Sequence, residues 1–201
     1  MFRKTLLSAA TVAAMMSTVP AFADVISTTD AGQGKIQFTG SVIDAPCSIV
    51  PESQNIQVNL GQVNLKTLSN EGNTSSSVPF TINLAGCSFD APTSPSTTVQ
   101  YSKVAVTFPD ANSPAGKESQ GEIVNGAADA AGNVVIQLLK SDATSPVNLT
   151  KRTPSGTDAD NIQLDATSAT SKLQFYARMM ATGVATAGNV GATVTYKLHY
   201  F

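Results

Sequence analysis

Residues 188–201 read GNVGATVTYKLHYF, and from Val190 to Tyr200 an apolar side chain occupies every second position. Alternation of this kind places all side chains of one parity on the same face of a β-strand. The polar parity carries Asn, Thr, Lys and His. The stretch therefore predicts a strand with one buried face, whose members are Val190, Ala192, Val194, Tyr196, Leu198 and Tyr200.

The same alternation recurs along the chain, at 36–42, 78–84, 104–108, 134–138 and 173–179. Segments rich in Gly, Pro, Ser, Asn and Asp separate these runs, and such segments form turns and loops. No helical periodicity of useful length follows the first residues. Several short strands at this spacing predict one all-β domain, an antiparallel sandwich of immunoglobulin-like type.

The beginning of the chain has the pattern of a secretory signal peptide. Arg3 and Lys4 precede a mostly apolar stretch at 6–19, and Ala21-Phe22-Ala23 fits the small-x-small cleavage pattern. A retained membrane anchor is the alternative, but the apolar part is shorter than the roughly 20 residues that span a bilayer. We expect cleavage after residue 23, which leaves 201 − 23 = 178 residues.

Charge and composition exclude one class of partner. The net charge is −2 and charged residues make up 13% of the chain, about half the usual fraction of roughly 25%. A nucleic-acid-binding surface requires clustered Lys and Arg. We therefore expect no nucleic-acid partner.

Cys47 and Cys87 are the two cysteines of the sequence. Because an exported protein meets an oxidising compartment, a Cys47–Cys87 disulfide is favoured over two buried free thiols. Closing this loop stabilises the fold by roughly 4 kcal/mol in the chain-entropy model. Two cysteines and the single His199 do not make a four-ligand zinc site.

No set of residues predicts catalysis or a cofactor. His199 lies on the polar parity of the last run, where a solvent-facing side chain is expected. The glycines around Gln33 lack the third glycine and the helix of a dinucleotide-binding motif. Asp158, Asp160 and Asn161 could suggest a calcium loop, but the EF-hand spacing and its closing Glu are missing, so a solvated turn is expected.

Three segments together resemble pilin subunits of the chaperone–usher pathway, nearest to the major shaft subunits of P-type and type 1 fimbriae. The first, GKIQFTGSVIDAPCSI at 34–49, contains a Gly-x-Val-x-x-Ala-Pro-Cys pattern that ends at Cys47. The second is LAGCSF at 84–89. The third is the C-terminal run, with Gly188 fourteenth from the end and Tyr200 penultimate. The resemblance covers essentially the whole chain after residue 23.

The resemblance implies an incomplete immunoglobulin-like sandwich that lacks its seventh strand and carries an N-terminal donor-strand extension. Residues 24–38 would be this extension and 39–201 the pilin domain. In such proteins the arm of the next subunit fills the groove beside the last strand. The donor residues would be Gly32, Gly34, Ile36 and Phe38, and the groove or chaperone-binding residues Gly188, Val190, Ala192, Val194, Tyr196, Leu198, Tyr200 and Phe201.

Simpler interpretations remain for both ends. A polar, glycine-containing N-terminus is usually a frayed end, and the last run could be an ordinary core strand. The chain also ends in Tyr-Phe, whereas tyrosine plus a polar residue is common in the family. Phe201 would place an apolar side chain near the contact between the terminal carboxylate and the chaperone.

The resemblance implies a structural subunit of a surface fimbria that supports cell adhesion, with no enzymatic activity. Its partners would be a periplasmic chaperone, an outer-membrane usher, and copies of itself and other pilins. A minor adaptor or adhesive tip subunit of the same fibre is the alternative. A third possibility is an exported enzyme or inhibitor with a complete sandwich, which would fold unaided as a soluble monomer.

Overall fold

The computed structural model describes residues 34–89 and 101–201, so the expected signal peptide and residues 24–33 of the expected arm lie outside the described part. The chain divides into two units, 1–41 and 42–201. In the first unit, residues 34–41 form no helix or strand. Ile36 and Phe38 are 78% and 88% exposed. The alternation that begins at Ile36 therefore does not mark a formed strand.

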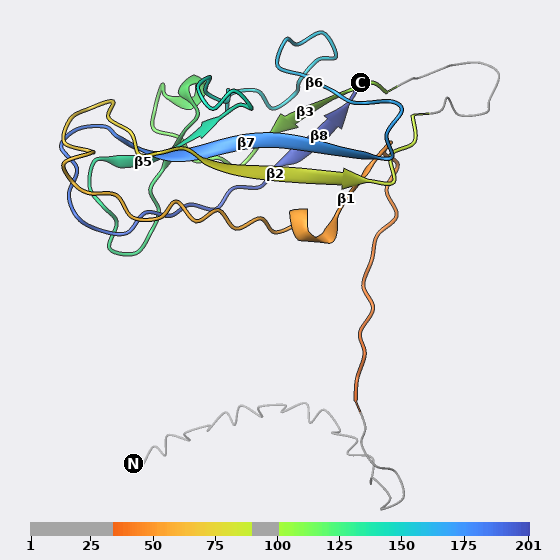
Figure 1. Cartoon of the computed structure of the whole chain (residues 1–201), viewed down its shortest axis with the longest axis horizontal. Coiled ribbons are helices and arrows are strands. Elements are labelled where there is room, and N and C mark those ends of the chain that lie inside the picture. The colour runs from red at the N-terminus through yellow and green to blue at the C-terminus, as the bar shows by residue number, and fades with distance from the viewer. Residues whose placement is uncertain (1–33, 90–100) are drawn as a thin grey trace, which may run out of the picture. The chain divides into compact units, whose positions relative to one another are not determined.

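The larger sheet of the second unit has five antiparallel strands in the order β1-β2-β7-β5-β4. The longest pairing joins β2 to β7, which run side by side in Figure 1. The register places Phe80 opposite Phe175 and Ile82 opposite Leu173. The bounds are β1 Ser48–Ile49, β2 Val78–Ala85, β4 Glu122–Val124, β5 Val134–Leu139 and β7 Thr170–Ala181.

The smaller sheet has three antiparallel strands in the order β6-β3-β8. Val104 and Val106 of β3 pair with Tyr200 and Leu198 of β8. Two short 3-10 helices, η1 (Pro51–Ser53) and η2 (Glu118–Gln120), lie outside the sheets. The strand bounds are β3 Lys103–Thr107, β6 Ile162–Gln163 and β8 Lys197–Tyr200.

The main core is formed by apolar side chains from both sheets. Ile82 and Leu173 of the larger sheet and Val104 of the smaller sheet are at most 1% exposed. The ring of Phe108, directly after β3, meets that of Phe175 edge to face, with 6.2 Å between centroids. The predicted all-β, immunoglobulin-like sandwich is confirmed. No helix in residues 34–89 or 101–201 has the length and apolar character to cross a membrane.

Cys47 and Cys87 form a disulfide, as predicted. Cys47 directly precedes β1, and Ser48 pairs with Ala85 at the end of β2. Cys47 is 2% exposed and belongs to the main core. The bond therefore joins the segment before β1 to the segment that follows β2.

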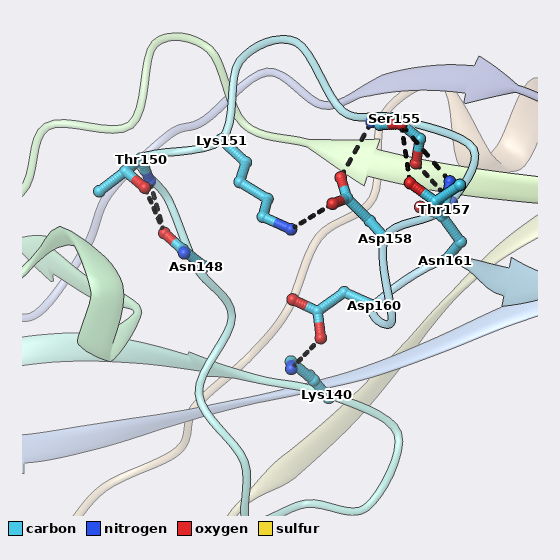
Figure 2. A network of polar contacts seen from close by, with 9 residues as sticks. All are labelled: Lys140, Asn148, Thr150, Lys151, Ser155, Thr157, Asp158, Asp160 and Asn161. Carbon is cyan, nitrogen blue, oxygen red and sulfur yellow. Dashed lines mark hydrogen bonds and ion pairs between the residues drawn. The ribbon is translucent and has the colours of Figure 1, made fainter.

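Two acidic residues near position 160 form ion pairs with lysines, as Figure 2 shows. Lys140, directly after β5, pairs with Asp160. Lys151 pairs with Asp158 at 3.2 Å, and the same carboxylate accepts a hydrogen bond from the Ser155 amide at 2.9 Å. These bonds lower the pKa of Asp158, the backbone bond most. The two carboxylates therefore serve to hold the loop that precedes β6.

The interpretation of His199 as a solvent-facing residue needs correction. Its side chain is only partly exposed, and Nε2 lies 2.9 Å from the Thr107 hydroxyl. Thr107 is 4% exposed. Burial, followed by the nearby Lys197, lowers the pKa of His199. This histidine thus links β8 to β3 through a side-chain contact, in addition to the backbone pairing.

Candidate functional site

A groove of about 1470 Å³ opens between two segments that are far apart in sequence. One wall is residues 54–63 and the other is residues 186–196. Neither segment is a strand, apart from one isolated bridge at Asn189. Apolar side chains of the larger sheet form most of the floor, together with Phe108, which directly follows β3. The sheet residues include Phe80, Ile123, Ile136, Leu138, Ala177 and Met179.

The first wall alternates between partly buried and exposed side chains. Ile56, Val58 and Leu60 pack against the main core, whereas Gln57 and Asn59 are exposed. This is the pattern of a strand with one buried face. This segment was not predicted as a strand, although the alternation in IQVNL at 56–60 is visible in the sequence.

The second wall is the first half of the predicted last strand. Val190, Val194 and Tyr196 pack against the core, while Thr193 and Thr195 are exposed. The strand itself, β8, begins only at Lys197. Val190, Val194 and Tyr196 follow the predicted alternation, whereas Ala192 is exposed. Residues 190–196 have no neighbouring strand within the described ranges with which to form a ladder.

Polar side chains hold the second wall in its extended conformation. The Asn125 side chain donates to the Asn189 carbonyl at 2.8 Å and accepts from the Gly191 amide at 3.0 Å. Asp110 accepts from the amide and hydroxyl of Thr195 at 2.7 and 2.6 Å. The side-chain and then the backbone bond from Thr195 lower the pKa of Asp110. The wall is thus fixed in place without a partner strand.

The predicted groove residues fall into two groups. Gly188, Val190, Ala192, Val194 and Tyr196 line the groove.

The remaining three lie further along the chain. Leu198 and Tyr200 belong to β8 and pair with β3. The Phe201 carbonyl accepts hydrogen bonds from the amides of Ser102 and Lys103 at 2.7 and 2.9 Å. The structure thus places this second group beside β3.

Gly34, Ile36 and Phe38 of the predicted donor set lie in the first unit, and Gly32 lies outside the described residues. No helix or strand forms at 34–41. The donor role of these residues stays a prediction.

The family model for fimbrial protein matches residues 36–200, which include both walls of the groove and the disulfide. The chain belongs to the fimbrial protein family. Curated relatives agree with this assignment. The F17 fimbrial protein of Escherichia coli is 36% identical over 174 residues, which cover 87% of this chain and 91% of that protein.

A second fimbrial relative is the type-1 fimbrial protein, A chain, of Escherichia coli K12. It is 32% identical over 178 residues, or 89% of each chain. Among solved structures, a subunit of a chaperone–usher pilus aligns with a TM-score of 0.61 at 22% identity, covering 85% of this chain and 96% of that one. The likeness to this structure concerns the fold. The chain is therefore a fimbrial subunit with the fold of known pilus subunits.

Proposed function

We propose that the groove receives one extended strand from a neighbouring copy of this chain, so that subunits join head to tail into a fibre. The observation that carries the proposal is an apolar floor between two walls that belong to neither sheet, with residues 192–196 of the second wall free of backbone–backbone hydrogen bonds to other described residues. A strand laid between them would complete the sandwich. The function proposed for the chain is that of a structural fimbrial subunit polymerised by donor-strand exchange.

The walls offer the groups that such a strand needs. Neighbouring strands lie about 4.8 Å apart and are joined by backbone hydrogen bonds. The amides of residues 192–194 make no hydrogen bond with the described part of the chain. Unpaired backbone and an open apolar floor favour aggregation unless they are covered. An incoming strand would pair with the amides of Ala192 and Val194, which point away from the edge that Asn125 and Asp110 occupy, and it would bury the apolar floor.

Residues 24–38 have apolar side chains at the alternate positions that the missing strand requires. Gly34, Ile36 and Phe38 share one parity, and the two large side chains are exposed in the first unit. Alternate residues of an inserted strand point into the groove, where Ile and Phe would meet the floor. Fifteen extended residues reach about 50 Å, which exceeds the span of either wall. The arm is therefore long enough to fill the groove.

The proposed contact produces a filament rather than a closed dimer. The groove and the arm are different surfaces, so each subunit keeps one of each free for the next neighbour. Before assembly, a periplasmic chaperone would cover the groove and an outer-membrane usher would receive the subunit. Export through the periplasm to the cell surface follows from this route. The fimbrial relatives support the proposal.

Deletion of residues 24–38 behind an intact signal peptide tests this function. The shortened subunit keeps its groove, so it should accumulate with its chaperone but fail to extend a fibre. A matched variant with Ile36→Ala and Phe38→Ala keeps the arm length and should also assemble poorly. Incorporation of the deleted subunit along sheared fibres, at the level of the intact chain, would disprove the proposal.

A further inference from the structure

We propose that the hydrogen bond from Tyr196 to Ser53 closes one end of the groove and fixes the register in which a strand enters it. This inference rests on the proposed function, since it concerns the same groove. Tyr196 is the last lining residue of the second wall, and Ser53 directly precedes the first wall. The Tyr196 hydroxyl donates to the Ser53 carbonyl at 2.7 Å, so the bond joins the two walls.

The Ser53 side of the bond is held firmly. Ser53 ends η1 and is 1% exposed. Its hydroxyl accepts a hydrogen bond from the Asn83 amide of β2 at 2.9 Å. The η1 helix is thereby fixed to the larger sheet, and Tyr196 is fixed to η1. This corner therefore connects the second wall to the centre of the sandwich.

The opposite end of the groove is closed by a second link. The Ala185 amide donates to the Leu68 carbonyl at 3.2 Å, and both residues are buried in the second apolar cluster. Between the two links, residues 186–195 span roughly 30 Å at about 3.3 Å per residue. A strand lying in the groove thus meets a boundary at each end.

The links at the two ends of the groove matter because the side chains of the arm specify its register against the walls only weakly. A shift by two residues keeps every side chain of a strand on the same face. Gly32 and Gly34 occupy two of the inward positions and have no side chains with which to oppose such a shift. Past Tyr196 the last strand is already paired with β3, from Lys197 onward. A strand shifted in that direction would have to break the Tyr196–Ser53 bond.

The test measures register inside fibres built from the full chain. Thr193→Cys places a thiol on the exposed parity of the second wall. It is combined in turn with Gln33→Cys, Lys35→Cys or Gln37→Cys on the polar parity of the arm, because side chains opposite each other on one face lie within disulfide reach. We expect covalent multimers on a non-reducing gel from one of the three double variants. A cross-link within one chain runs as a monomer and is thereby distinguished.

Adding Tyr196→Phe removes the hydroxyl and keeps the ring. Multimers should then form in two or all three double variants, because the strand is no longer stopped at one position. Ser53→Ala keeps the carbonyl that accepts from Tyr196 but removes the hydroxyl that accepts from the Asn83 amide. It frees η1 from the larger sheet and should broaden the pattern indirectly, because Tyr196 is then bonded to a helix that can move. Tyr101→Phe is the matched control, since Tyr101 is exposed and does not line the groove, and it should leave the single pattern unchanged.

Failure of the register inference and failure of the proposed function give different cross-linking results. Several cross-linking positions in the parent chain, or an unchanged single position with both Tyr196→Phe and Ser53→Ala, would overturn the register inference and leave the proposed function standing. Intact fibres with no cross-link at any of the three positions would overturn both, because the arm would not lie beside Thr193.

Discussion

At Gly188 the second wall passes so close to another part of the backbone that a side chain has no space. A Cβ atom there would lie 2.4 Å from the Ala131 amide nitrogen and 2.7 Å from the Ala130 carbonyl carbon. The obstacle is backbone, which cannot move aside as a flexible side chain can. Glycine at this position is therefore required for steric reasons, at the point where the wall begins.

Gly188→Ala should consequently destabilise the domain by about 1–3 kcal/mol, the usual effect of forcing extra atoms into a packed site. Gly191→Ala on the same wall is the matched control, because its Cβ would meet the Ala127 side chain at an ordinary 3.6 Å. The measurement is the free energy of unfolding in urea. Equal losses for the two variants would show that the close approach at Gly188 has no special effect.

Glu122 is a buried carboxyl group on an edge strand. It is 1% exposed, and its Oε2 has no hydrogen-bond partner among the described residues. Desolvation raises its pKa from the usual 4.5, while Lys117 lowers it and Glu71 raises it to smaller extents. Across the strands, the Gln137 side chain accepts a hydrogen bond from Arg178 and donates one to the Gln120 carbonyl, so it is not directed at Glu122. Desolvation of the ionised carboxylate therefore outweighs its attraction to Lys117.

The sign of the pH dependence follows from this shift. Because the folded-state pKa is raised, the contribution of Glu122 to stability is complete below about pH 4.5 and is lost as the pH rises through the folded value. Glu122→Gln removes the titrating group, so its stability should decline less over this range than that of the parent. Urea unfolding at several pH values between 4 and 8 measures the difference. Parallel curves for the two proteins would contradict the burial argument.

At the scale of elements, the two walls are extended segments without a ladder. Backbone amides that lack a partner exchange quickly with solvent, whereas paired strands are protected. Ala192, Thr193 and Val194 should therefore exchange fast in the free domain. Consecutive amides of an extended segment point to opposite edges, and those of Gly191 and Thr195 point to Asn125 and Asp110. A bound peptide of residues 24–38 should therefore slow the exchange of Ala192 and Val194. Gly191 and Thr195 provide internal references, since Asn125 and Asp110 already accept their hydrogen bonds. Equal exchange with and without peptide would mean that no strand pairs with this wall.

Alternation predicted the paired strands well because their inward side chains are large and apolar. The runs at 78–84, 104–108, 134–138 and 173–179 correspond to β2, β3, β5 and β7. The alternation did not predict where the last strand starts. A strand requires a neighbouring strand for backbone pairing as well as alternating side chains, and this pairing begins only at Lys197. The three-residue β4 was missed, because its residues Glu122–Val124 are too few to show an alternation.

The polar parts of the groove could not be predicted from one sequence. Ser53 is buried because its hydroxyl accepts the Asn83 amide, a contact between residues that no local pattern connects. The link from Tyr196 to Ser53 likewise depends on tertiary structure. Gly188 was predicted from its resemblance to a family position, and the structure supplies the steric reason for the glycine.

Within the second unit as a whole, two paired sheets support one open groove. The disulfide joins the start of this unit to the end of β2, and removing such a bond costs roughly 2–5 kcal/mol. Replacing both cysteines by alanine should lower the free energy of unfolding by that amount, measured by urea denaturation without reductant. A loss below about 1 kcal/mol would show that the bond contributes little to the stability of this unit.

The central claim is that the domain lacks a strand which residues 24–38 can supply. Its most direct test is the thermal unfolding of residues 39–201 with increasing concentrations of a peptide of residues 24–38, compared with an Ile36→Asn, Phe38→Asn peptide. A ligand at 100 times its dissociation constant adds about 2.7 kcal/mol to stability, or roughly 5–11 °C for a domain of this size. We predict a rise of this order with the natural peptide alone. An unchanged unfolding temperature at every concentration would contradict the account.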